Sequence, residues 1–209
     1  MDRVSTNMSL DSVTAEYYDV LKEIGNIGAG NATTALAQLM QTKVDMSVPQ
    51  VKLLEFKDLG ELMGGEELVM AGIFLGIEGD ISGSIMFLLD TAAAKHLVGK
   101  LMMGMELPDD GFSEMELSAL KEVGNIITGA YLNALSMMTN LVILPTVPDL
   151  AVDMAGALLS VPAIQFGIQG DKILLIQTQF FDEIELDGYF ILLPEMESYE
   201  IILKALGIA

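Results

Sequence analysis

The sequence predicts a mixed α/β fold in which two related repeats share a central, mainly antiparallel sheet flanked by helices. The first observation is an internal duplication, since DVLKEIGNIGAGNATTAL at residues 19–36 matches SALKEVGNIITGAYLNAL at residues 118–135. Corresponding positions differ by 99 in number (118 − 19 = 99). The second observation is that each half holds too few strands to bury both faces of a sheet of its own. One sheet shared by both halves therefore fits better than two separate sheets.

The first half begins with a long helix, expected over residues 11–40 because apolar residues recur there with a helical period. The next stretch alternates in polarity and is interrupted by Pro49, which predicts two short strands or one bent edge strand. The remaining expected elements are a short helix at 56–63, strands at 68–77 and 81–89 joined by a turn at 78–80, and a helix at 91–103.

The second half repeats this order. Ser113 and Glu116 form a capping box at the start of a helix that runs to about residue 138. Residues 155–165 fit either a helix or a strand, because Pro162 interrupts them. The remaining expected elements are strand-forming sequence at 141–154, strands at 172–181 and 189–193, and a helix at 197–206.

The two halves set the expected domain organisation. Their last strand and helix align with an offset of 105 rather than 99, so the second half has six extra residues (105 − 99 = 6). We expect a single domain over residues 1–209, built from repeats at about 10–108 and 109–209 that are related by a pseudo-twofold axis.

Composition argues against several classes of function. The 30 acidic and 10 basic side chains give a net charge of −20, which disfavours nucleic acid because phosphate neutralisation needs a basic face. The same charge disfavours an anionic membrane surface. The absence of cysteine excludes disulfides, thiolate metal sites and cysteine nucleophiles. The first residues lack the basic start and apolar core of a signal peptide, so we expect a cytoplasmic protein.

One uncharged stretch, residues 123–148, is long enough to cross a bilayer. It contains Asn125, Asn133 and Asn140 as well as two prolines, and burying these amides in lipid would be costly. We therefore expect a helix inside the protein core and no insertion into a membrane.

The duplicated helix carries a polar stripe in each copy. At about 3.6 residues per turn, one face of the first helix presents Asp19, Glu23, Asn26 and Gly30. The same face of the second helix presents Ser118, Glu122, Asn125 and Gly129. Each glycine leaves space beside the amide. Both copies share the core K-E-x-G-N, which favours a functional role over an ordinary solvated surface, because unconstrained surface positions diverge first after a duplication.

A glutamate and an asparagine form a limited set of chemical groups. They lack a nucleophile–base pair and the ligand cluster that a transition metal needs, so we expect no metal and no cofactor in this chain. An asparagine amide can orient a water molecule, and a glutamate can pair with a cation on a partner. These capacities suit hydrolysis of a bond that is already activated elsewhere, where positioning is the main requirement.

Two other features of the sequence are considered as functional sites. The segment GNIGAGN at residues 25–31 resembles a glycine-rich phosphate loop. A nucleotide-binding regulator is therefore a third, less favoured function. The segment follows a helical pattern and not a strand, which is the wrong context for a dinucleotide fingerprint. The lone His96 falls on a predicted surface helix, and we assign it no role.

The whole pattern resembles a known signature. It reads Asp19-x3-Glu23-x2-Asn26-x22-Pro49 in the first copy and Ser118-x3-Glu122-x2-Asn125-x22-Pro148 in the second. This pattern resembles the signature of the CheC family of chemotaxis phosphatases, and the likeness covers nearly the whole chain. Two intact copies are more similar to the CheC type than to the CheX type, which usually keeps one site per subunit. The first position differs between the copies, so the two sites need not be equally active.

The resemblance implies hydrolysis of the aspartyl phosphate of the response regulator CheY. It implies that Glu23 and Glu122 pair with a lysine of the regulator. It also implies that Asn26 and Asn125 insert toward the phosphoryl group and position the attacking water. The Mg²⁺ ion would belong to the substrate protein. Family members also bind the deamidase CheD, so the alternative is an adaptor that mainly binds CheD and CheY, with weak catalysis.

Overall fold

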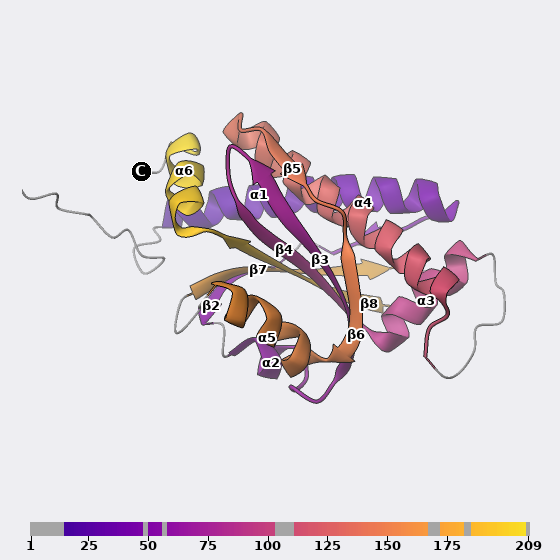
Figure 1. Cartoon of the computed structure of the whole chain (residues 1–209). Helices are drawn as coiled ribbons and strands as arrows, with labels where there is room; N and C mark the ends of the chain where they lie inside the picture. The colour runs from indigo at the N-terminus through magenta and orange to yellow at the C-terminus, as the bar shows by residue number, and fades with distance from the viewer. Residues whose placement is uncertain are drawn as a thin grey trace, which may run out of the picture.

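The computed structural model describes residues 15–47, 50–55, 58–102, 111–166, 172–181 and 185–207 (Figure 1). These residues form six helices and eight strands. In chain order the elements are α1 (Ala15–Met40), β1 (Asp45–Met46), β2 (Gln50–Glu55), α2 (Leu59–Leu62), β3 (Val69–Gly79), β4 (Gly83–Asp90), α3 (Thr91–Leu101), α4 (Glu114–Thr139), β5 (Ile143–Pro145), β6 (Asp149–Met154), α5 (Ala155–Phe166), β7 (Lys172–Phe181), β8 (Glu185–Pro194) and α6 (Met196–Ala205).

The strands form one antiparallel sheet to which both halves of the chain contribute. Its central order is β7-β8-β4-β3, and short strands flank it at both sides. On one side β1 and β2 of the first half pair with β7 of the second half. On the other side β5 and β6 of the second half pair with β3 of the first half. The outer strands of each half thus pair with a strand of the other half. The prediction of a shared, mainly antiparallel sheet is confirmed.

The centre of the sheet shows the symmetry of the duplication. The antiparallel ladder between β4 and β8 sets Met86 opposite Ile191. These two residues differ by 105 in number (191 − 86 = 105), which is the offset between the last strands of the two halves. A residue that faces its own counterpart across an antiparallel ladder marks a local twofold axis. The pseudo-twofold axis therefore passes between β4 and β8.

Helices cover both faces of the sheet (Figure 1). Residues of α1, α3, α4 and α6 share one buried cluster with Ile85 and Phe87 of β4. Residues of α2 and α5 share a second cluster with Met86 and Leu88 of the same strand. Successive side chains of a strand point to opposite faces, so β4 is apolar almost throughout because both of its faces are buried.

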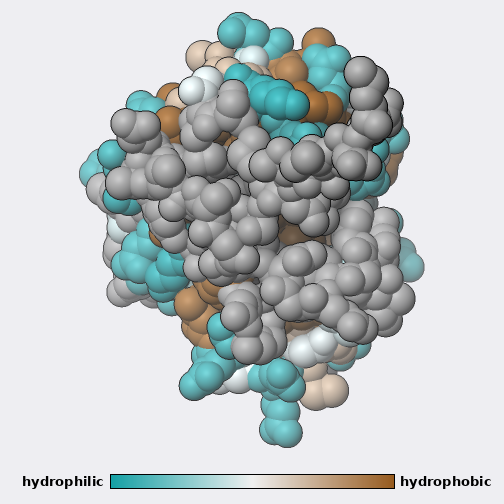
Figure 2. Space-filling view, turned by 90° about the vertical axis from the view of Figure 1, so that its left-hand side faces the viewer, coloured by the Kyte–Doolittle hydropathy of each residue, from teal (hydrophilic) through white to brown (hydrophobic). Residues whose placement is uncertain are grey.

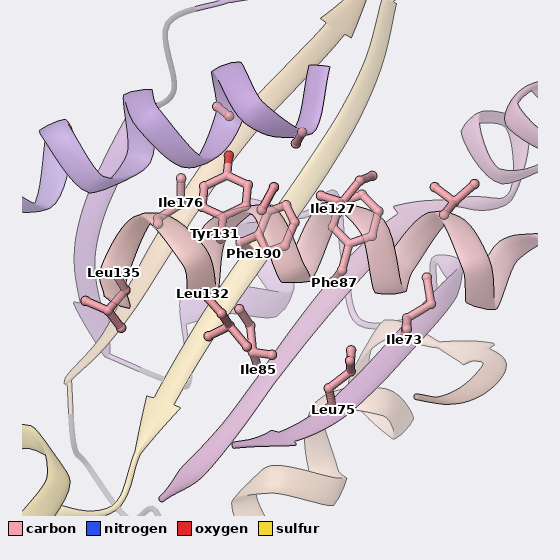
Figure 3. Packing of buried hydrophobic residues seen from close by; sticks show 14 of the residues in the cluster. Ile73, Leu75, Ile85, Phe87, Ile127, Tyr131, Leu132, Leu135, Ile176 and Phe190 are labelled. Carbon is pink, nitrogen blue, oxygen red and sulfur yellow. The ribbon is translucent and has the colours of Figure 1, made fainter. Parts of the chain in front are cut away.

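An aromatic stack lies between α4 and the middle of the sheet, and Figure 3 shows it from close by. The ring of Tyr131 lies 4.2 Å from that of Phe190, which stacks at 4.6 Å on Phe87. The Tyr131 hydroxyl also shares a buried hydrogen bond of 2.7 Å with Thr178 of β7. The stack therefore ties α4 to strands of both halves.

Most of the predicted elements are present, and the differences have a physical reason. The capping box of Ser113 and Glu116 is formed, and residues 155–166 form a helix despite Pro162. The predicted turn at 78–80 is wrong, because Glu78 and Gly79 continue β3 by pairing with β5. Likewise β8 begins at Glu185, because its first residues pair with the end of β7. Pairing partners far away in the sequence thus extend both strands.

Several predictions fall partly outside the described residues, among them the first residues of the helices expected at 11–40 and 56–63. Pro49 lies between the described segments, as do residues 103–110 around the boundary of the two repeats. The boundaries at about 10–108 and 109–209 therefore remain a prediction. Among the helices of the described segments, none combines the length and the apolar character needed to cross a bilayer.

Candidate functional site

The two duplicated helices, α1 and α4, lie side by side and run in roughly opposite directions (Figure 1). Their contact depends on Gly28. A Cβ atom added there would lie 2.5 Å from Cδ1 of Tyr131 and 3.0 Å from its Cα, too close for any larger residue without movement. Gly28 aligns with Ile127, so this glycine is not part of the repeated pattern. It allows the two helix backbones to approach each other closely.

The inner face of α4 rests on β3. A Cβ atom added at Gly124 would lie 2.7 Å from Cγ2 of Ile73, and the neighbouring Val123 and Ile127 are fully buried. On α1, Leu21 and Ile24 are buried in the same cluster. The apolar faces of both helices therefore turn toward the sheet, and their polar faces turn away from it.

On α1 the polar stripe is exposed. Asp19, Glu23, Asn26 and Gly30 all lie at the surface. Asp19 forms an ion pair of 3.8 Å with Lys22, and because both side chains are exposed it contributes little to stability. The carboxylate of Glu23 and the amide of Asn26 are separated by three residues, so they project from neighbouring turns of one helix face.

On α4 the equivalent stripe is less open. Ser118 and Glu122 are exposed, whereas Asn125 and Gly129 are half-buried. Leu120, which lies between Ser118 and Glu122 in the sequence and faces the sheet, is fully buried. The structure thus brings the predicted glutamate and asparagine together in both copies, but it makes the second asparagine less accessible than the first.

The space beside each asparagine is open, as predicted from the glycine that follows it by four residues. A Cβ atom added at Gly30 or at Gly129 would meet no heavy atom within 4 Å. The hydroxyl of Thr34 is turned back to the helix and donates a hydrogen bond of 3.0 Å to the carbonyl oxygen of Gly30. The surface beside each amide is therefore not blocked by a side chain at the glycine position.

The start of α4 is anchored one turn before the stripe. The N–H of Ser113 donates to Oε2 of Glu116 at 2.6 Å, and the N–H of Glu116 donates to Oγ of Ser113 at 3.3 Å. Lys95 of α3 lies 3.9 Å from Oε1 of Glu116. The hydrogen bonds with Ser113 hold the pKa of this enclosed carboxyl below its usual value, with a smaller contribution from Lys95. No sequence pattern indicated the contact between Lys95 and Glu116.

Pro148 has a different position from the helical stripe. It is half-buried in the connection between β5 and β6, directly before the edge strand β6. In the same connection, Oγ1 of Thr146 accepts a hydrogen bond of 2.9 Å from the N–H of Gly76 on β3. Proline keeps the chain extended at such an edge, so Pro148 is placed to shape the sheet. Within the described residues, no three His, Asp or Glu side chains lie close enough together to hold a metal ion.

Comparison with known proteins identifies the family. A model of the CheC-like family matches residues 18–53 and 115–152, which are the two segments that carry the stripes. The chain is 38% identical over 202 residues to the CheY-P phosphatase CheC of Bacillus subtilis (strain 168), an alignment that covers 94% of this chain and 97% of that protein. The chain belongs to the CheC family.

Solved structures share the fold of this CheC family member at low sequence identity. FliY of Thermotoga maritima superposes with a TM-score of 0.75 at 19% identity, covering 94% of this chain and 98% of that one. The FliM middle domain of Helicobacter pylori (H. pylori) gives a TM-score of 0.69 at 15% identity, covering 92% and 99%. CheX in a complex with CheY, BeF3 and Mg²⁺ from Borrelia burgdorferi gives 0.51 at 20% identity, covering 80% and 96%.

Proposed function

We propose that this chain hydrolyses the aspartyl phosphate of a CheY response regulator, with one site on α1 and one on α4. The main support is the pair of outward-facing Glu–Asn stripes in a chain that is 38% identical, over 94% of its length, to a CheY-P phosphatase. Glu23 and Asn26 form the first site, and Glu122 and Asn125 form the second. The open surface at Gly30, or at Gly129, leaves room for the partner's phosphoryl group.

In this proposal the glutamate docks the partner. Glu23 and Glu122 are exposed carboxylates on rigid helices, and each can form an ion pair with a lysine in the active site of the regulator. Glutamate and asparagine lie three residues apart, which is about 4.5 Å along the helix axis. A lysine held by the glutamate therefore brings the neighbouring acyl phosphate close to the amide.

The asparagine orients the water molecule that attacks phosphorus. Its amide oxygen accepts a hydrogen bond from this water, and its NH₂ group can donate to a phosphoryl oxygen. The water forms the new P–O bond, the bond to the aspartate oxygen breaks, and the aspartate leaves as a carboxylate. Mg²⁺ held by the substrate protein neutralises charge on the phosphoryl group, so this chain has to supply only position.

The decisive test is to replace both asparagines. Phosphorylated CheY is mixed with the wild type, with Asn26→Ala, with Asn125→Ala and with the double variant, and its decay is followed. We expect each single variant to keep part of the activity and the double variant to lose about 10²-fold, as expected when a positioning group is removed. Asn31→Ala is the matched control, because Asn31 is exposed on α1 but points to a different side of the helix. Decay that is as fast with the double variant as with the wild type would exclude this function.

A second proposal concerns CheD. We propose that CheD binds this chain as a regulator, and the alternative is that binding CheD and CheY is the main role, with weak catalysis. The adaptor role is supported by the limited set of chemical groups at each stripe, which is a glutamate and an asparagine. Comparing CheY-P decay with and without CheD separates the two proposals. Weak turnover in both conditions, with CheD binding that the double Asn variant leaves intact, indicates an adaptor. We also propose that this chain is located in the cytoplasm.

A further inference from the structure

The polar stripe of α4 has an exposed methionine near each end. Met115 is 67% exposed and Met137 is 71% exposed. These two methionines are the large apolar side chains of α4 that are exposed to solvent. Met115 precedes Glu122 by seven residues, which places it within about 20° of the glutamate around the helix. Met137 follows Glu122 by fifteen residues and lies about 60° away. Measured from Asn125, the angles are about 80° for Met115 and 120° for Met137. Both methionines therefore lie on the exposed surface of α4 along the flank of the stripe that Glu122 forms, and Met137 is the farther from Asn125.

The duplicated helix α1 has polar residues at the corresponding positions. Subtracting 99 from 115 and 137 leads to Glu16 and Gln38. A single exposed methionine is ordinary on a protein surface. Here the two copies share the glutamate and the asparagine of the stripe but differ at both ends, where the residues are polar in α1 and apolar in α4. The α1 stripe also has Asp19 where the α4 stripe has Ser118, so it is the more acidic of the two.

The distance between the two methionines matches the size of a partner domain. They are separated by 22 residues (137 − 115 = 22), which is about 33 Å along a helix and close to the diameter of a small domain. Both ends therefore lie within reach of one protein that is docked over Glu122 and Asn125. Figure 2 shows the side of the molecule that faces left in Figure 1, where hydrophobic and hydrophilic residues lie next to each other at the top.

The turn that carries Met115 is already ordered. The capping box between Ser113 and Glu116 spans it, and Lys95 of α3 contacts Glu116 from one side. Nζ of the same lysine lies 4.9 Å from the centre of the Phe112 ring. Little backbone freedom is lost when this turn is covered, so the apolar contact of Met115 contributes to affinity with a small entropic cost.

We propose that Met115 and Met137 determine how the second site binds its substrate. They bury their side chains against an apolar surface of the phosphorylated response regulator, on either side of the Glu122–Asn125 pair. The first site, which lacks these contacts, binds the same partner mainly through its acidic stripe. This inference rests on the proposed function, because it takes the partner of both sites to be CheY.

The test isolates one site at a time. In the Asn26→Ala background, where only the α4 site is complete, Met115→Ser with Met137→Ser raises KM for phosphorylated CheY about tenfold and leaves kcat unchanged. Replacing both methionines by leucine keeps KM low, because the apolar surface is retained. In the Asn125→Ala background the rise is much smaller, and KM depends more steeply on salt. Val161→Ser is the matched control, since Val161 is exposed on α5 at the other side of the sheet.

Three results would overturn the inference. They are an unchanged KM after the serine substitutions, an equal rise in both backgrounds, and a salt dependence that is the same at both sites. A dimer of this chain that the serine substitutions abolish would assign the methionines to a second copy and would also overturn it.

A binding measurement keeps this test separate from the proposed function. CheY activated with beryllofluoride carries a stable mimic of the phosphoryl group, and its Kd can be measured even if turnover is absent. If the double Asn variant hydrolyses as fast as the wild type, the proposed function fails. The methionine contacts are still supported in that case if the serine substitutions raise the Kd in the Asn26→Ala background, and they are refuted if the Kd is unchanged.

Discussion

Replacing Gly28 by alanine tests whether the close contact between α1 and α4 positions the two sites. The added Cβ would lie 2.5 Å from Cδ1 of Tyr131. This ring is poorly able to move, because it is buried, stacks at 4.2 Å on Phe190 and shares a hydrogen bond of 2.7 Å with Thr178. We therefore expect the two helices to separate slightly at the substitution, at a cost in folding free energy.

The magnitude follows from a comparison with Gly30→Ala on the same helix. Both substitutions gain about 1 kcal/mol of intrinsic helix propensity. At Gly30 the added Cβ meets no atom within 4 Å, so this variant should be more stable than the wild type. At Gly28 the overlap costs about 1–3 kcal/mol, as is typical of overpacked cores. The difference between the two variants removes the propensity term and isolates the cost of the contact.

Thermal and urea denaturation of the two variants, followed by circular dichroism, measures this difference. A gap of about 2 kcal/mol corresponds to about 4–8 °C in Tm for a chain of this size. Gly30→Ala should have the higher Tm, and Gly28→Ala the lower one. If Gly28→Ala proves as stable as Gly30→Ala, the close packing of α1 on Tyr131 is refuted.

Three further predictions concern the site and its supports. Gly30→Ala in the Asn125→Ala background should lower kcat for CheY-P while raising stability, because its Cβ occupies the open space beside Asn26. An unchanged kcat would show that the substrate does not use this space. Glu116→Gln should cost about 1 kcal/mol at neutral pH. The lowered pKa of Glu116 means that its carboxylate stabilises the fold above the ordinary value of 4.5, so the advantage of the wild type should fade in urea titrations as the pH drops below this value. Tyr131→Phe should cost about 1–3 kcal/mol by leaving the buried Thr178 hydroxyl unpaired, and adding Thr178→Val should recover part of that loss in a double-mutant cycle.

Local patterns in the sequence were enough to predict most of the helices and strands. The capping box of Ser113 and Glu116 and the helical spacing of Glu122 and Asn125 depend on residues within a few turns of one another. The same holds for the open space beside Gly30 and Gly129, which follows from the absence of a side chain. The ends of β3 and β8 were predicted less well, because a strand ends where its partner in the sheet ends.

The sequence by itself determined that two copies of a Glu–Asn stripe exist and that each lies on the outward face of a helix, because a helical period is a local property. Only the tertiary structure decided how the copies are joined. The exchange of β2 and β6 between the halves, the pairing of Met86 with Ile191 and the contact of Gly28 with Tyr131 all link residues about 75 to 125 positions apart. Such contacts are set by packing and strand pairing across the whole chain. They produce no periodic pattern in the sequence of either segment that takes part in them.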